Sequence, residues 1–498
     1  MKKLINFRPI TLTGVCFAVG IFIADFFPTL KAWTFIIPVF AVILVAALYA
    51  AFYKKKKVLK ISLAALYFSA VCLLGAGSLL LKANIAESRA LSAGTYLVTG
   101  EITEYYSDDG NTNIVLGNCV SGGKKTGNIY VSGFSGEGKL YETLEISLKV
   151  SPVKSDGRIS GLLKRGVSSY SDTVYYSAVK GESGALSGKF LRIAEETFYG
   201  GMNEREARVA TAMFTGATYG MRSEKEWYRA AGLSHIFAVS GLHVGMLFGA
   251  LSFVLSLLRL KRIPKAAIIG AAVVFYAYLC GLSASCVRAA VMCTVFAFTS
   301  ALGEKPDRIN SISVAFIIVL AIDPADMFSV GFILSFTVSL SLIILSSPIK
   351  RAFKFLPDKL SSLFSGLIAA ELASAPICII KFGSFPLSAL VMNLLFLPIL
   401  SFVYYFLWIT FVFGAVFPAV REVAAYIPSL FLFGTDEIAK FVSAFSPAIT
   451  VFPPALCSLY YPAAVFGSDI VNTGKKIKAA CFFAMILSLA ACAFVSFI

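Results

Sequence analysis

Charged residues are scarce in this chain, and their scarcity excludes a soluble fold of ordinary composition. Of 498 residues, only 14% are charged and 58% are hydrophobic, whereas soluble domains carry about 25% charged residues. A single soluble core stops growing at about 250–300 residues, so it could not hide this much apolar surface. The apolar runs of about 17–28 residues have the length of helical membrane spans. The sequence therefore predicts a polytopic α-helical membrane protein.

Patterns that catalysis or metal binding would need are also missing. The two histidines, His235 and His243, belong to no HExxH motif, and the ten cysteines include no CxxC pair. Residues 133–140 nearly spell a phosphate-binding loop, but Leu140 stands where that loop needs Ser or Thr. Ser283 lacks the GxSxG context of a serine hydrolase. We therefore predict no enzyme activity, no cofactor and no metal site.

The chain opens with three apolar runs, at about 10–27, 33–53 and 61–81. No small-residue cleavage site follows the first run, so we interpret it as a membrane anchor and not as a signal peptide. Four lysines at 54–57 separate the second run from the third, and loops rich in Lys and Arg stay in the cytoplasm. This predicts an N-terminal domain of three spans, residues 1–89, with a cytoplasmic N-terminus.

Residues 90–188 differ sharply in composition from the rest of the chain. Stretches of alternating β-branched and aromatic residues, such as TYLVTGEITEYY, lie between turns rich in Gly, Asn and Asp. They predict a small extracellular all-β domain with the size of an OB-like barrel. Nine basic and ten acidic residues leave it nearly neutral, so DNA contact would need local clusters. Candidates for such contact, each of which could equally be solvated barrel surface, are Tyr105, Tyr106, Arg158, Lys164 and Arg165.

Residues 189–498 are predicted to form a second, helical transmembrane domain. Two amphipathic stretches, 189–198 and 203–216, are expected at the membrane interface. The apolar runs that follow lie at about 230–258, 266–282, 286–302, 310–322, 328–347, 361–380, 387–416, 423–445, 450–467 and 479–498. The number of spans after residue 416 stays open, because some of these runs are short or carry charge. Strongly basic loops alternate with acidic or uncharged ones, so the net charge of +16 is mainly a topology signal that puts the C-terminus outside.

Both histidines lie in one stretch, LSHIFAVSGLHVGMLFG at 233–249. If the whole stretch were one helix, His235 and His243 would lie about 80° apart around its axis, with Ser240 and Gly241 between them. Two interpretations stay open. The stretch is either a tightly packed helix with hydrogen-bonded histidines or the polar lining of a pathway.

Arg288 and Glu371 are the only charges well inside their apolar runs. An arginine at that depth costs roughly 2.5–3.5 kcal/mol on insertion scales. Arg288 therefore either reaches the outer interface or faces a pathway or a partner. Glu371 is a possible partner, since a pair would offset much of the desolvation cost of both groups.

Prolines interrupt the apolar stretch 375–398, which also contains Asn393. The prolines are Pro376, Pro386 and Pro398. Proline breaks a helix in mid-run, and freed backbone groups are tolerated only beside protein or water. Broken helices are therefore predicted here, either lining a pore or packed as kinks.

Four stretches, in this order, resemble the motifs of the ComEC family of bacterial competence proteins. HIFAVSGLHVG (235–245) is similar to the first motif, and GLSASCVRAAVM (281–292) is similar to the second. DPADMFSVGFILSF (323–336) is similar to the third, although Ile333 stands where glutamine is common, and the proline-rich stretch with Asn393 resembles the fourth. The three-span start and the small β domain also resemble the family's N-terminal arrangement.

The resemblance implies a channel that carries single-stranded DNA through the bacterial cytoplasmic membrane during natural transformation. It implies an OB-fold domain outside and a "competence" domain over 190–498. It also implies a separate DNA receptor, a nuclease and a cytoplasmic motor as partners. Larger family members continue into a metallo-β-lactamase-like domain that degrades one strand. This chain stops at 498 without an HxHxDH cluster, so we expect another protein to degrade that strand.

The motif positions, together with the intramembrane charge at Glu371, supply the pathway candidates. They are His235, Ser240, Gly241, His243, Arg288, Glu371 and Asn393. The alternative function is a transporter for another anionic or hydrophobic solute on the same fold. The chain has no ATPase motif, so a partner motor or the membrane potential would have to drive either process.

Overall fold

The computed structural model describes residues 9–26, 56–108, 111–136, 138–153, 159–182, 184–469, 471 and 474–497. The predicted span at 33–53 and the candidate Arg158 lie outside the described residues. The chain divides into two compact units, each of which is described by itself. The first contains Pro9–Lys189 and Phe316–Met327, and the second contains Phe190–Ala315 and Phe328–Ile498.

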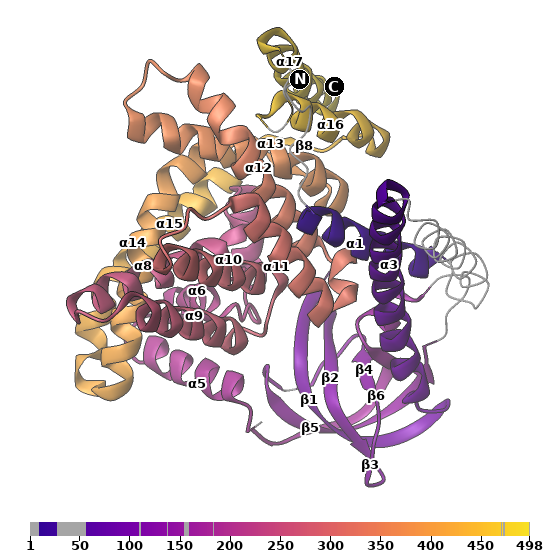
Figure 1. Cartoon of the computed structure of the whole chain (residues 1–498). Coiled ribbons are helices and arrows are strands. Elements are labelled where there is room, and N and C mark those ends of the chain that lie inside the picture. The colour runs from indigo at the N-terminus through magenta and orange to yellow at the C-terminus, as the bar shows by residue number, and fades with distance from the viewer. Residues whose placement is uncertain are drawn as a thin grey trace. The chain divides into compact units, whose positions relative to one another are not determined.

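Two helices, α1 (Pro9–Phe26) and α3 (Lys56–Ser88), pack against each other in the first unit (Figure 1). Glycines let the two backbones approach closely. A Cβ atom on Gly20 would overlap the carbonyl oxygen of Cys72, and one on Gly75 would overlap that of Phe17. Such small-residue contacts are typical of helix pairs inside membranes.

Five strands of the first unit close into a barrel (Figure 1). They are β1 (Gly94–Asp108), β2 (Asn111–Ser121), β4 (Asn128–Val131), β5 (Glu142–Pro152) and β6 (Val167–Glu182), and a short β3 (Lys124–Lys125) pairs with β2. The order is β1-β5-β6-β4-β2, and β2 pairs with β1 again to close the ring. All these pairs are antiparallel except β4 with β6. The small OB-like barrel predicted from the sequence is confirmed.

The barrel core follows from the alternation in its strands. Along β5, every second side chain is buried, namely Leu144, Ile146, Leu148 and Val150, because successive residues of a strand point to opposite faces. These side chains meet Val98 and other core residues of the neighbouring strands.

The remaining described elements are mostly helices. They are α4 (Gly161–Lys164), α5 (Leu186–Tyr199), α6 (Glu204–Thr215), α7 (Arg222–Ala230), η2 (Ser234–Ile236), α8 (Gly241–Leu257), α9 (Arg262–Leu279), α10 (Ala284–Ala301), α11 (Arg308–Ile322), η3 (Pro324–Phe328), α12 (Val330–Ala352), α13 (Asp358–Phe382), β7 (Phe385–Pro386), α14 (Ala389–Val416), η4 (Pro418–Val420), α15 (Arg421–Ser443), β8 (Ala448–Ile449), η5 (Pro454–Leu456), α16 (Cys457–Gly467) and α17 (Lys475–Phe497). Within the described ranges, eight helices are long and apolar enough to cross a membrane: α1, α3, α9, α10, α12, α13, α14 and α17. The polytopic helical fold is thus confirmed.

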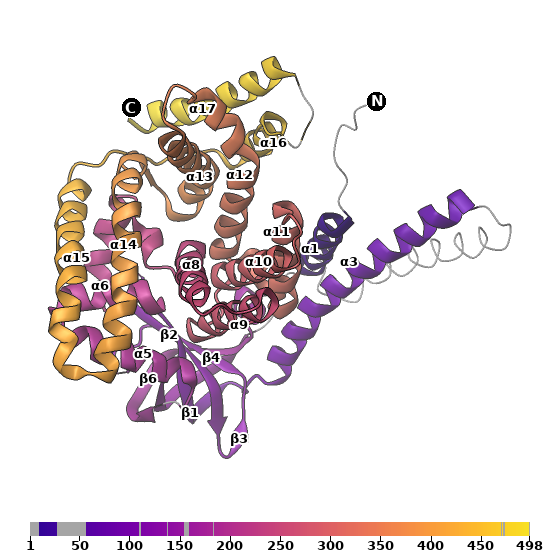
Figure 2. The ribbon, with the colours of Figure 1, turned by 60° about the vertical axis from the view of Figure 1, so that its left-hand side comes forward.

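At two of the three prolines the helix continues, which favours packed helices over broken ones at these positions. α13 continues through Pro376 and α14 continues through Pro398, whereas Pro386 lies in the short strand β7. A proline removes one hydrogen bond and bends a helix, but neighbouring helices can accommodate the freed group. Figure 2 shows α14 running unbroken beside α15, with which it packs.

The amphipathic helix α5 buries its apolar face against protein. Its residues Phe190, Ala194 and Phe198 belong to the main core of the second unit. The ring of Phe190 lies 5.5 Å from that of Phe214 in α6 and 6.4 Å from that of Tyr276 in α9. The hydrophobic face predicted from the sequence is therefore present, and helices of the same unit cover it.

Candidate functional site

The first motif is divided between two elements and does not form one helix. His235 lies exposed in the 3-10 turn η2, whereas His243 lies buried in the first turn of α8. Ser240 is the N-cap residue between them. Its Oγ accepts from the N–H of Leu242 at 3.3 Å, and its own N–H donates to Nδ1 of His243 at 3.1 Å. This reciprocal capping box begins α8 at Gly241, so the prediction of one continuous helix is wrong.

His243 is packed into the core of the second unit. Only 3% of its surface is exposed, and its ring lies 4.8 Å from that of Tyr404. The Tyr404 hydroxyl donates to that of Tyr276 at 2.8 Å, which donates to the carbonyl of Phe214 at 2.8 Å. His243 therefore fits the packed interpretation, whereas His235 and Ser240 stay accessible.

Arg288 is a buried cation without a carboxylate partner. It lies in α10 with 9% of its surface exposed, and its Nε donates to Oγ of Ser335 in α12 at 2.7 Å. Its Nη1 lies 3.8 Å from Sδ of Met292. Among the described residues no Asp or Glu lies within ion-pair distance of it, so the pair with Glu371, one of the alternatives for Arg288, is not formed.

The Arg288 guanidinium lies against the start of α8. A Cβ atom on Gly241 would lie 2.7 Å from its Nη2, so the missing side chain makes room for the cation. The first N–H groups of a helix carry partial positive charge and lack partners within the helix. A guanidinium and a helix N-terminus together favour a phosphate or carboxylate group.

Glu371 and Asn393 form a second polar pair at membrane depth. Asn393 of α14 donates from Nδ2 to Oε1 of Glu371 in α13 at 2.7 Å. The Asn393 side chain is buried, and its Oδ1 has no hydrogen-bond partner in the part of the chain that the structure describes. A buried acceptor without a partner is costly, so this oxygen could accept a donor from a ligand.

The acidic start of the third motif has a structural role within the first unit. Lys82 of α3 donates to both carboxylate oxygens of Asp323, each at 2.7 Å. In the second unit, Ser329 caps α12 by accepting from the N–H of Phe332, and Ser335 binds Arg288. Sequence reasoning did not single out Lys82, and it did not count Ser335 among the pathway candidates. Ser335 lies inside the motif itself, so its position was the available signal.

The barrel candidates differ in how accessible they are. Tyr105 is half-buried against the barrel core, and Arg165 is exposed. Tyr106 pairs with Asn113 along the strand, but its side chain lies outside the described residues. Lys164 makes an ion pair of 2.5 Å with Asp25 at the end of α1, and the two side chains are 15% and 6% exposed. Its charge is therefore already neutralised within the protein.

Exposed tyrosines on β6 were not among the candidates chosen from the sequence. Tyr175 and Tyr176 are 61% and 54% exposed, and Tyr170 is also exposed. Leu97 of β1 is also exposed and lies in one row with Tyr176, because Ser147 of β5 pairs with both residues. Exposed aromatic rings on a barrel can stack on the bases of single strands. The alternating pattern of residues 167–182 could have revealed this surface.

The charges of α15 are accounted for inside the second unit. Arg205 of α6 forms ion pairs with both Asp436 and Glu437. The Arg205 guanidinium and the Lys440 ammonium also lie over the ring of Trp227 in α7, at 5.1 and 5.3 Å. These contacts join α6, α7 and α15, which explains how a charged helix packs on an apolar bundle.

Comparison with known proteins gives two matches and one negative result. The sequence profile of the competence protein family matches residues 213–468, a range that contains His235, Arg288, Glu371 and Asn393. ComE operon protein 3 of Bacillus subtilis (strain 168) is 32% identical over 175 residues, which are 35% of this chain and 22% of that protein. The match thus covers less than a quarter of that relative's length. No solved structure matches the chain.

Proposed function

Because the family profile covers just over half of the chain, this protein belongs to the competence protein family, and we propose that it is a transmembrane channel for uptake of single-stranded DNA. One observation carries the proposal. Arg288, within the matched range, is a buried cation that lies at a helix N-terminus without a carboxylate partner among the described residues. A phosphodiester supplies the anion that such a site lacks.

The site suits passage better than tight binding. A channel has to bind its cargo strongly enough to admit it and weakly enough to release it. One guanidinium beside the positive end of α8, whose first turn Ser240 caps, is a modest site for each passing phosphate. The Oδ1 of Asn393 is buried and without a partner among the described residues, so it is a neutral acceptor for a base or sugar donor once a rearrangement exposes it. Family membership favours DNA over another anionic solute as the cargo.

The barrel would then receive DNA before the membrane passage. Its exposed tyrosines on β6 provide rings for stacking in a domain whose basic and acidic residues nearly balance, so it would hold bases without binding the phosphate backbone strongly. We assign the barrel, residues 90–188, and the C-terminus to the outer face of the cytoplasmic membrane, and the N-terminus to the cytoplasm. Alkaline phosphatase fused after residue 188 should be active if this is right, and inactive if the orientation is reversed.

We assign transport, and no catalytic step, to this chain. The partners that we propose are a surface DNA receptor, a nuclease that leaves one strand, and a cytoplasmic motor. Deleting the gene in a transformable host should leave labelled DNA bound at the cell surface and abolish its arrival in the cytoplasm. Normal arrival of DNA in the deletion strain would contradict the proposal.

The point variant Arg288→Gln should reproduce the deletion while the protein still reaches the membrane. Its matched control is Arg262→Gln, because Arg262 is an exposed arginine at the start of α9 in the same unit. We expect the control to take up DNA normally. Full uptake by Arg288→Gln would remove Arg288 from the pathway.

A further inference from the structure

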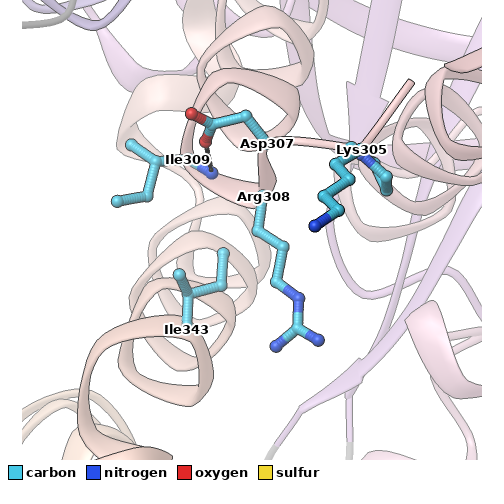
Figure 3. Close-up of a pocket in the computed structure, with 6 residues that line it drawn as sticks. Lys305, Asp307, Arg308, Ile309 and Ile343 are labelled. Atoms are coloured by element: carbon cyan, nitrogen blue, oxygen red, sulfur yellow. Dashed lines mark hydrogen bonds between the residues drawn. The ribbon is translucent and has the colours of Figure 1, made fainter.

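A hollow of about 480 Å³ lies beside the loop between α10 and α11 (Figure 3). It belongs entirely to the second unit, and it is lined by Lys305, Pro306, Asp307, Arg308, Ile309 and Ile343. None of the residues that we place in the DNA pathway lines it. The hollow therefore needs an explanation of its own.

Two cations face this hollow without partners of their own. Lys305 and Arg308 are exposed, and neither side chain makes a hydrogen bond or an ion pair within the described ranges of the chain. Figure 3 shows both side chains extending toward the same open side. Glu304, the neighbouring acid in this loop, is exposed and does not line the hollow.

The one acidic side chain in the lining is engaged elsewhere. Asp307 accepts from the N–H groups of Ile309 and Asn310, at 2.9 and 3.2 Å, and so caps the start of α11. Figure 3 shows its carboxylate turned away from the charged ends of Lys305 and Arg308. The open side is therefore positively charged.

The length of α11 bears on how deep in the membrane the hollow lies. α11 has 15 residues, which span about 22 Å, whereas the hydrocarbon core of a bilayer is about 30 Å thick. α11 is therefore shorter than the core, and the charge of Arg308 in its first turn favours a position of that end at the boundary between headgroups and acyl chains. The longer α12, with 23 residues, lines the hollow with Ile343 and continues past it to Lys350 and Arg351.

We propose that this hollow binds an anionic phospholipid. Lys305 and Arg308 would hold the phosphate of the headgroup, and Ile309 and Ile343 would contact the start of an acyl chain. Basic pockets between transmembrane helices recognise lipid headgroups in this way. Free phosphate shares the charge but not the chain, so the apolar wall favours the lipid. This site is independent of the cargo that the protein carries.

The test uses the full-length purified protein in phosphatidylcholine nanodiscs, with and without phosphatidylglycerol. Phosphatidylglycerol should raise the thermal unfolding temperature of the wild type, and native mass spectrometry should detect retained lipid. In the variant Lys305→Ala/Arg308→Ala we expect the apparent affinity to fall about twenty-five-fold, since each cation near an anionic lipid contributes roughly fivefold.

The matched control is Lys354→Ala/Lys359→Ala, which removes two exposed lysines near the turn between α12 and α13. It should respond to phosphatidylglycerol like the wild type. An equal loss in the control, or no loss in the Lys305/Arg308 variant, would overturn the proposal. Inorganic phosphate is the third arm, and a stabilisation as large as that by phosphatidylglycerol would overturn the assignment to a lipid. Ile343→Ala should weaken the lipid response and leave any response to phosphate unchanged.

Discussion

Ion pairs within the first unit contrast with two charges inside the apolar helices of the second unit that have no partner of opposite charge among the described residues. In the first unit, Lys164 pairs with Asp25 at 2.5 Å and Lys82 pairs with Asp323 at 2.7 Å, so each acid has a base. In the second unit, Arg288 binds only neutral groups, and Glu371 accepts from Asn393. The paired charges fix helices and barrel within their unit, whereas the unpaired ones leave a place for the charge of a ligand.

This difference has a measurable consequence. Loss of a paired charge in the first unit should lower stability, whereas loss of the unpaired Arg288 charge should leave stability unchanged or raise it. Removing one partner of a buried ion pair leaves an uncompensated charge and typically costs about 3–5 kcal/mol. Removing a buried cation that has no counter-charge relieves its desolvation penalty instead. Substitutions in the two units therefore separate charges that stabilise the fold from charges that we propose to act in transport.

The largest effect on stability is expected at Lys164. Lys164→Met leaves the buried Asp25 carboxylate alone and should lower the free energy of unfolding by about 3 kcal/mol, measured by thermal unfolding in detergent. The double variant Asp25→Asn/Lys164→Met is the control and should recover most of that loss. An unchanged unfolding temperature in Lys164→Met would mean that the pair does not fix the barrel to α1.

A smaller loss is expected at Lys82, because water reaches its pair with Asp323. The two side chains are 25% and 36% exposed, and partly exposed pairs contribute about 1 kcal/mol or less. Lys82→Met should therefore cost about a third of the effect at Lys164 in the same unfolding assay. An equal or larger effect would show that solvent exposure does not determine how much each ion pair contributes to stability.

Gly241→Ala tests the second unit by displacing the Arg288 guanidinium without removing its charge. The added methyl group would lie against Nη2 of Arg288, and the flexible end of the arginine can move aside. We expect a change in unfolding free energy below about 1 kcal/mol together with a clear loss of DNA uptake. The matched control is Gly245→Ala, because a Cβ atom there meets no other group within 4 Å. Normal uptake by Gly241→Ala would show that the guanidinium position is not critical.

The smallest effect is expected at Asp469, an exposed charge outside the membrane spans. Hydrogen bonds from Arg351, together with Lys478, lower the pKa of Asp469 to about 2. A carboxyl with a depressed folded-state pKa adds stability above its unfolded pKa of about 3.9 and loses it as the pH falls through 2. Asp469→Asn should remove this acid dependence with less than about 1 kcal/mol lost at neutral pH. An identical acid profile in the variant would contradict this role.

Much of the fold followed from the length of apolar runs. The predicted runs at 266–282, 286–302 and 361–380 correspond to α9, α10 and α13, because a bilayer selects helices by length. The start of α8 was missed because the capping box of Ser240 and His243 is a local contact that a hydropathy pattern does not show. Pro376 and Pro398 do not end α13 and α14, because neighbouring helices in a bundle can accommodate the bend that a proline causes.

The site was only partly predictable for a different reason. The motifs located Arg288, Glu371 and Asn393, but their pairing depends on how α10, α12, α13 and α14 rotate against one another. The partner of Asp323, Lys82, lies 241 residues away in sequence, so no local pattern points to it. Charge counting identified the barrel as nearly neutral, and it gave no hint of the exposed tyrosines on β6.

The most direct test of the central claim measures stability and DNA uptake together in Arg288→Met. This side chain keeps much of the arginine's volume without its charge. The account predicts an unfolding temperature at or above that of the wild type, with the arrival of labelled DNA in the cytoplasm abolished. A variant that unfolds at a lower temperature yet takes up DNA normally would contradict it, because Arg288 would then serve the fold and not the passage of DNA.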